Sequence, residues 1–449
     1  MVSSIRLGNF IKCWGIITCV AITSMFYFPF EFRALPSMNT KKLMAAAALV
    51  ILFFRMVNKR NITVDRNFIY LSILAGLVSF FGIVSVTFNN TEDYAYATYI
   101  MSFWVWWGAA YTVCTFIRWI HGHLTFQLVT NYLITVCVFQ CIIALVMDTN
   151  KAFKSFINAI VFQQDLIFEG NVHRLYGIGA SLDVAGMRFA AVLVMIIYLL
   201  ANARFEKRWY EYLLYFTSFI VITIAGNIIA RTTLVGTIMA LLYLTYVTFH
   251  QGIHPEHNYF VLWRWIAGLI IISIPLMTYS YQNDSQMRKN MRFGFEGFFN
   301  WVEKGQFSYT SNDKLKTMYI WPDNAKTWII GDGYFDNPYG NDPYYTGEIT
   351  EGYYKNTDVG YLRFIYYFGT VGLVMFSLFM FKTGQICANQ FPNKQLLFWM
   401  LLAVHFIIWS KVASDLFLVF ALFLCFNDNE EDEYNLIEEE ACLSDSRDV

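Results

Sequence analysis

Asn356-Thr-Asp-Val-Gly-Tyr-Leu-Arg-Phe-Ile-Tyr-Tyr-Phe-Gly-Thr-Val-Gly372 joins the one long polar interval of the chain to a new apolar run that reaches about Phe381. Asp358 therefore stands where a water-facing loop meets a helix that we expect to enter a membrane. A carboxylate at this depth costs free energy unless it has a function or a partner. Its position makes Asp358 the first candidate for a functional residue.

The composition is that of a polytopic membrane protein. Of the 449 residues, 57% are hydrophobic and only 14% are charged, and several apolar runs reach about 20 residues, the length that crosses a bilayer. The net charge of −1 favours no nucleic-acid partner. The eight cysteines show no metal-ligand spacing, so we expect neither a metal site nor a cofactor.

The apolar runs predict an all-α fold with about twelve membrane-spanning helices. The predicted spans are 10–29, 43–57, 67–88, 94–117, 125–147, 185–203, 210–226, 232–249, 259–281, 359–381, 395–410 and 412–426. The last run is short for a hydrocarbon core of about 30 Å.

Basic residues gather in alternate short loops, and such loops face the cytoplasm. They include Arg118, which follows the fourth span, and Lys394, which precedes the eleventh. This pattern places both termini in the cytoplasm. Lys41 and Lys42 are exceptions, because the same pattern places them on the outer side.

The spans divide the chain into four parts. Residues 1–281 hold the first nine helices and an outer interfacial segment at 148–184, in which residues 152–168 have the spacing of an amphipathic helix. Residues 282–358 form a large outer loop, which we expect to fold as a cap over the bundle. Residues 359–426 hold the last three helices. The tail, 427–449, has ten acidic residues against one base.

The cap is rich in aromatic and acidic side chains. Short helices are expected at 292–303 and 311–325, and turns from Gly331 to Gly347. Aromatic rings beside carboxylates suit sugars, because the C–H faces of a sugar stack while its hydroxyls need acceptors. The alternative is that these rings form the core of the cap and an interfacial belt.

Charged residues that are distant in sequence converge at the outer ends of the spans. They are Arg174, Arg188, Arg231, Asp358, Arg363, Lys411 and Asp415. Any one of them could snorkel to the surface or form an ion pair, as Lys411 could with Asp415. Taken together, mostly basic and beneath an aromatic cap, they favour an anionic ligand at the membrane surface.

Two short motifs resemble the bacterial O-antigen ligase and O-antigen polymerase superfamily. Its signature is a His and a small polar residue, nine residues, and then Gly-x-x-Gly. Here Asp358 takes the place of the His, and Gly369 and Gly372 are the two glycines. The run Arg231-Thr-Thr-Leu-Val-Gly236 resembles the family's Ser/Ala-Arg-Ser/Thr element, and its place in the predicted topology agrees.

This resemblance implies a GT-C-like glycosyltransferase of the bacterial inner membrane, with its active site on the periplasmic face. The donor would be a glycan on undecaprenyl diphosphate, and the acceptor a single lipid-linked repeat unit. The reaction would invert the anomeric carbon without a metal ion, and a chain-length regulator protein is an expected partner. The resemblance covers Asp358 and Arg231, and the convergence of charges adds Arg188, so we expect catalysis from Asp358, Arg231 and Arg188. We expect substrate binding from Arg174, Arg363, Lys411 and Tyr361.

Three other functions remain open at this point. An O-antigen ligase would move the finished glycan to lipid A–core, and the two motifs do not separate it from a polymerase. A flippase for lipid-linked sugars would suit twelve spans, although transporters place polar breaks near the midplane. A scaffold of an envelope-assembly complex would not explain the buried arginines. Asp358 itself could act as a general base or could orient the acceptor.

Overall fold

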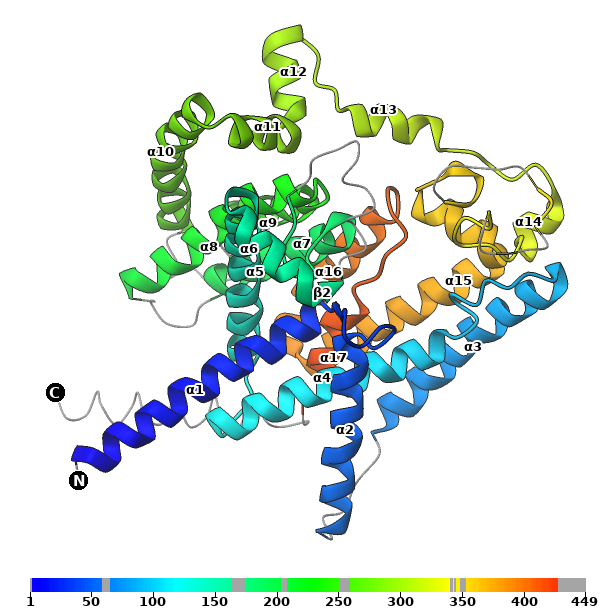
Figure 1. Ribbon diagram of the computed structural model, residues 1–449, viewed down its shortest axis with the longest axis horizontal. Coiled ribbons are helices and arrows are strands. Elements are labelled where there is room, and N and C mark those ends of the chain that lie inside the picture. Colours follow the sequence, from blue (N-terminus) through cyan, green and yellow to red (C-terminus); the bar gives the residue numbers. More distant parts are fainter. Residues whose placement is uncertain are drawn as a thin grey trace.

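The computed structural model describes residues 2–58, 65–162, 175–202, 208–250, 259–339, 342, 345–347 and 353–426, with side chains from residue 12 onward. The chain is almost entirely helical (Figure 1). Two short strands, β1 (Glu31–Phe32) and β2 (Val161–Phe162), form an antiparallel pair in which Glu31 lies opposite Phe162.

Each predicted span contains a helix, but the last one, 412–426, is helical only from Phe417 to Leu424. Further short helices lie between the spans. In chain order the α-helices are α1 (Val2–Tyr27), α2 (Thr40–Val57), α3 (Arg66–Asn89), α4 (Tyr99–His121), α5 (Phe126–Thr149), α6 (Lys151–Ile160), α7 (Leu182–Ala201), α8 (Trp209–Ile229), α9 (Thr233–Phe249), α10 (Tyr259–Asn283), α11 (Ser285–Gly294), α12 (Glu296–Lys304), α13 (Thr310–Thr317), α14 (Ala325–Ile329), α15 (Gly360–Gln390), α16 (Gln395–Ile408) and α17 (Phe417–Leu424). Two 3₁₀ turns are η2 (Tyr354–Asn356) and η3 (Pro392–Lys394).

The length and composition of the helices make this a helical membrane protein. Among the described residues, seven helices are long and apolar enough to cross a membrane: α3, α4, α5, α7, α8, α10 and α15. Three shorter apolar helical stretches are Lys12–Tyr27 within α1, Thr233–Phe249, which is α9, and Pro392–Ile408, which comprises η3 and α16. The count of twelve spans stays a prediction.

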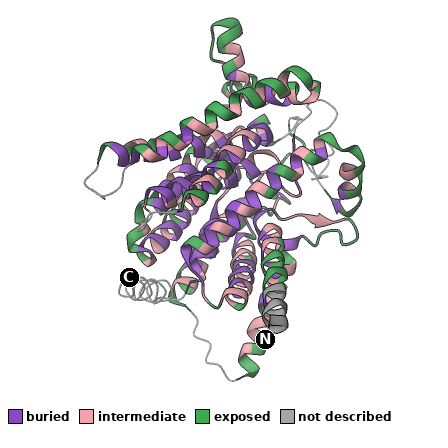
Figure 2. Cartoon of the chain, turned by 90° about the vertical axis from the view of Figure 1, so that its left-hand side faces the viewer, coloured by how far each residue is buried: buried purple, intermediate pink, exposed green. Residues whose placement is uncertain are grey.

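Helix α7 is the centre of the bundle. Nearly all of its residues are buried, and it packs against α5, α8, α9 and α16. The approach to α9 is close because glycine lies at the contact: a Cβ on Gly236 would stand 2.2 Å from the Cα of Ala190. Buried residues accordingly fill the interior of the bundle, while the outward faces of the helices are exposed (Figure 2).

Helix α15 differs from the predicted span 359–381 in two ways. It continues past Phe381 to Gln390, because its polar last turns find partners within the protein: the Gln390 amide donates to the carbonyl of Phe426 at 3.1 Å. It is also interrupted at Phe368 and Gly369, where the backbone leaves the helical region. Gly369 has φ 68° and ψ −176°, a conformation open essentially only to glycine.

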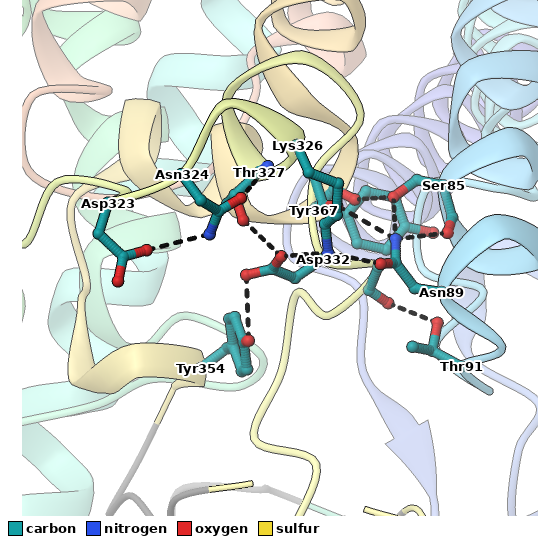
Figure 3. A network of polar contacts seen from close by, with 12 residues as sticks. Ser85, Asn89, Thr91, Asp323, Asn324, Lys326, Thr327, Asp332, Tyr354 and Tyr367 are labelled. Atoms are coloured by element: carbon teal, nitrogen blue, oxygen red, sulfur yellow. Dashed lines mark hydrogen bonds and ion pairs between the residues drawn. The ribbon is translucent and has the colours of Figure 1, made fainter.

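The break in α15 is closed by the part of the cap that directly follows α14. The N–H groups of Asp332 and Gly333 donate to the carbonyls of Tyr366 and Tyr367 at 2.6 and 3.1 Å. The hydroxyl of Ser85, from α3, also donates to the Tyr367 carbonyl, at 2.6 Å (Figure 3). These bonds satisfy backbone carbonyls that the interruption leaves without a helical partner. The first glycine of the Gly-x-x-Gly motif therefore creates a docking point for the cap.

Replacing Gly369 with Ala should lower the stability of the protein by about 1–3 kcal/mol from backbone strain alone. A Cβ there would also stand 2.1 Å from the carbonyl oxygen of Ile329, so the cap must shift as well. Thermal unfolding of the detergent-solubilised protein measures the loss. Gly268→Ala on α10 is the matched control, because its Cβ would meet nothing within 4 Å; equal melting temperatures for the two variants would contradict this account.

The cap is a chain of short helices rather than the two that the sequence predicts. The expected helix 292–303 is wrong in its boundaries, because α11 ends at Gly294 and Phe295 separates it from α12. The expected helix 311–325 is wrong in its extent, since α13 ends at Thr317. Helices α11 to α13 lie above the bundle and α14 lies against α15 (Figure 1).

Candidate functional site

Charged and aromatic side chains meet at one end of the bundle, which we call the cap face. It comprises residues 90–98, 181–188, 230–232, 331–336, 353–363 and 409–416. Hydrogen bonds join pairs of these segments: the Asp93 carboxylate accepts from the backbone N–H groups of Phe335 and Asp336 at 2.7 and 3.0 Å. The Tyr361 N–H donates to the carbonyl of Trp409 at 3.2 Å.

Asp358 lies on the cap face just before α15 begins. It is half-buried, and it follows the 3₁₀ turn that starts at Tyr354. Among charged groups, Asp358 has the largest influence on the phenol of Tyr353. Burial, followed by Asp358, raises the pKa of Tyr353, and Arg363 opposes the shift. The phenol is therefore protonated at neutral pH and can donate a hydrogen bond.

Arg363 is held between two aromatic rings in the first turn of α15. Its guanidinium carbon lies 3.8 Å from the ring centroid of Phe335 and 3.7 Å from that of Tyr353. Nη2 donates to the Phe335 carbonyl and to the Asp336 carboxylate, both at 3.0 Å. The side chain is only 4% exposed. Arg363 thus joins α15 to the cap, and its planar faces are covered by protein.

Lys411 pairs with a residue other than the one considered from the sequence. Its Nζ lies 2.9 Å from Oδ1 of Asp183, in the first turn of α7. Asp183 also acts electrostatically on Tyr353. The Lys411–Asp183 pair therefore lies on the cap face together with Tyr353. The suggested pairing of Lys411 with Asp415 is wrong.

Arg188 lies deeper, one turn and a half into α7. It is 6% exposed, its Nε has no hydrogen-bond partner among the described residues, and its guanidinium faces the ring of Phe28 at 5.7 Å. Lys41 and Asp415 are close enough to Arg188 to interact with it electrostatically. Lys41 was not predicted as a site residue. Its predicted place on the outer side, where basic residues are otherwise rare in short loops, could have indicated it.

Arg231 is directed toward the cap. Its guanidinium pairs with the carboxylate of Glu296 in α12 at 2.8 Å and donates to the hydroxyl of Ser311 at 2.8 Å and to the carbonyl of Phe293 at 3.0 Å. The ring of Tyr309 lies 5.3 Å away. The hydroxyl of the neighbouring Thr232 donates to the backbone carbonyl of Asp183 at 3.4 Å. Arg231 therefore lies close to the Lys411–Asp183 pair, although its own charge is engaged by Glu296.

The remaining predicted residues divide as follows. Tyr361 donates through its hydroxyl to the carbonyl of Phe406 at 2.8 Å, and its ring packs edge-on against Trp409. These contacts join α15 to α16. Arg174 lies outside the described residues. Within the described part of the chain, no three His, Cys, Asp or Glu side chains group as the ligands of a metal would.

Two cap residues joined the site only in the structure. Tyr353 and Asp336 were among many aromatic and acidic residues of the cap, and nothing in the sequence singled out Asp336. Asp336 is exposed, and its carboxylate accepts from the Arg363 guanidinium at 3.0 Å. A possible signal was the proximity of Tyr353 to Asp358, since only five positions along the chain separate them.

Comparison with known proteins places this chain in no group. No family model, curated protein or solved structure matches it. The residues of the cap face are therefore the only basis on which a function can be proposed for this chain.

Proposed function

We propose that this protein is a membrane glycosyltransferase of the O-antigen polymerase type. It transfers a glycan from an undecaprenyl-diphosphate donor to a lipid-linked repeat unit, at the periplasmic face of a bacterial inner membrane. One observation carries the proposal. A carboxylate, Asp358, shares the cap face with the Lys411–Asp183 pair, the protonated phenol of Tyr353 and the enclosed Arg363.

The proposed reaction is a single displacement. The acceptor hydroxyl oxygen attacks the anomeric carbon of the donor sugar, and Asp358 takes the hydroxyl proton. The bond from that carbon to the phosphate oxygen breaks, and its electron pair leaves with the diphosphate. Such a base contributes about 10²–10⁴-fold to the rate, and attack from the opposite side inverts the anomeric configuration.

The leaving diphosphate needs positive charge beside it. Of the predicted basic residues, Arg231, Arg363 and Lys411 already form ion pairs within the protein. Arg188 is therefore the better candidate, and Lys41 is close enough to interact with it electrostatically. Electrostatic stabilisation of such a leaving group by one donor is worth about 2.7–4 kcal/mol in the transition state. A lipid carrier can remain in the bilayer while its diphosphate reaches this depth.

The surface glycan of a deletion strain tests the proposal. With a polymerase missing, we expect glycans one repeat long on a polysaccharide gel, and restoration of the ladder when the gene returns. Absent surface glycan with accumulated lipid-linked polymer would instead identify a ligase. Loss of both would identify a flippase, and an unchanged ladder would reject all three.

A further inference from the structure

Helix α12 in the cap turns an apolar face away from the protein. Phe298, Trp301 and Val302 are spaced i, i+3 and i+4 along this helix, so they share one face. Their exposed fractions are 48%, 59% and 81%. Phe307, just beyond the helix, is also exposed, and its ring packs edge-on against Phe298 with the centroids 5.5 Å apart. These four residues form one apolar surface, which we call the α12 patch.

The opposite face of α12 makes the contacts with the rest of the protein. The Glu296 carboxylate lies 2.8 Å from the guanidinium of Arg231. The Phe299 ring stacks on Tyr281 of α10 with the centroids 5.6 Å apart, and Glu303, one turn further along, pairs with an arginine of α11. An amphipathic helix in water does the reverse, because it buries its apolar face and exposes its polar one. An apolar environment outside the protein is therefore needed to cover the α12 patch.

Helix α10 indicates that this environment is lipid. It is long and apolar enough to cross a membrane, and only 11% of its most apolar stretch is buried inside the protein. Leu276 and Tyr279, near its C-terminal end, are exposed. Helix α11 begins after the single residue Asp284, and α10, α11 and α12 follow one another at one edge of the molecule (Figure 1). The stacking on α10 holds α12 beside this end, so the lipid that surrounds α10 can continue onto the α12 patch.

We propose that the α12 patch inserts into the interfacial layer of the bilayer and anchors the cap to the membrane surface. Trp301 suits this layer, because its indole ring is apolar with one polar edge. Lys304, which is exposed at the end of the helix, can extend to lipid phosphates. Since Glu296 begins the same helix, the anchor also holds the carboxylate that binds Arg231. The contact with lipid is independent of the reaction proposed above.

A nitroxide spin label attached to Val302→Cys tests the anchor in the full-length protein, in nanodiscs of phosphatidylethanolamine and phosphatidylglycerol. Cys13 and Cys442 are replaced by Ser, and the spectrum of protein without the added cysteine is subtracted. Oxygen concentrates in lipid and a neutral nickel chelate stays in water, so their collision rates with the nitroxide distinguish the two environments. We expect the ratio of oxygen to nickel collisions to be several-fold higher at residue 302 than at Asn312→Cys, an exposed polar position of α13.

Phe298→Cys repeats the measurement one turn earlier on the same face and should give the same high ratio. Both substitutions are at exposed positions, so the fold should tolerate them. A label on the α12 patch that meets nickel as often as the label at residue 312 lies in water, and this result overturns the anchor. A label that meets neither reagent is covered by protein, from this chain or from a second copy, and overturns it as well.

Discussion

Replacing Asp358 with Asn is expected to slow chain extension by about 10²–10⁴-fold, the usual contribution of a general base. The amide has the size of the carboxylate but cannot accept the proton of the acceptor hydroxyl. Because Asp358 lies outside the helices, just before α15, and is only half-buried, the substitution should leave the fold intact. The measurement is polymer length over time with purified protein and lipid-linked repeat units.

Three comparisons make this result specific. Asp358→His should retain part of the activity, because an imidazole can also take the proton of the acceptor hydroxyl. Asp323→Asn removes an exposed cap carboxylate and should have no effect. If Asp358 orients the acceptor rather than taking its proton, Asp358→Asn should raise KM for the acceptor more than it lowers kcat. Full activity of Asp358→Asn would eliminate both roles.

The helices could be predicted from sequence because each has a local cause. An apolar run of sufficient length must satisfy its own backbone inside a membrane, and a helix does so without distant partners. The positions of α3, α5 and α8 therefore agree with the predicted spans within a few residues. Helix α15 shows the limit: its extension to Gln390 depends on a partner near the end of α17, which the apolar run does not reveal.

The glycines of the motif show the same limit in another form. Their spacing from Asp358 was visible in the sequence, but the reason for Gly369 was not. Its backbone conformation is required by the approach of Ile329, which is forty positions earlier in the chain. Only the folded cap reveals that the motif marks a docking point.

The sequence predicted that charged residues would gather on the cap face, but it did not predict the partner of each one. An isolated charge near a membrane indicates that something must compensate it, but not what does so. Arg231 finds Glu296 sixty-five positions away, and Lys411 finds Asp183 across the bundle. The ring of Tyr353 packs on the guanidinium of Arg363. This contact depends on the path of the chain between the cap and α15.

Replacing Arg231 with Ala should abolish chain extension and loosen the cap at the same time. The pair with Glu296 is largely buried, at 13% and 19% exposure of the two side chains, and loss of hydrogen bonds to a charged group costs about 1.5–3 kcal/mol. Limited proteolysis between α12 and α13 should therefore speed up in the variant. Arg292→Ala breaks an exposed ion pair with Glu303 in the same cap and should change neither property.

Exchanging the charges of Arg231 and Glu296 distinguishes two roles for Arg231: holding the cap in place, or binding the leaving diphosphate. If Arg231 acts by holding the cap, Glu296→Arg combined with Arg231→Glu should regain protease resistance and a measurable part of the activity, because the pair forms again with its ends reversed. If Arg231 instead binds the leaving diphosphate, the exchange places a carboxylate beside it and the double variant stays inactive even when the cap is closed. The contacts of Arg231 with Glu296, Ser311 and Phe293 lead us to expect recovery. A closed but inactive double variant would return Arg231 to the catalytic residues.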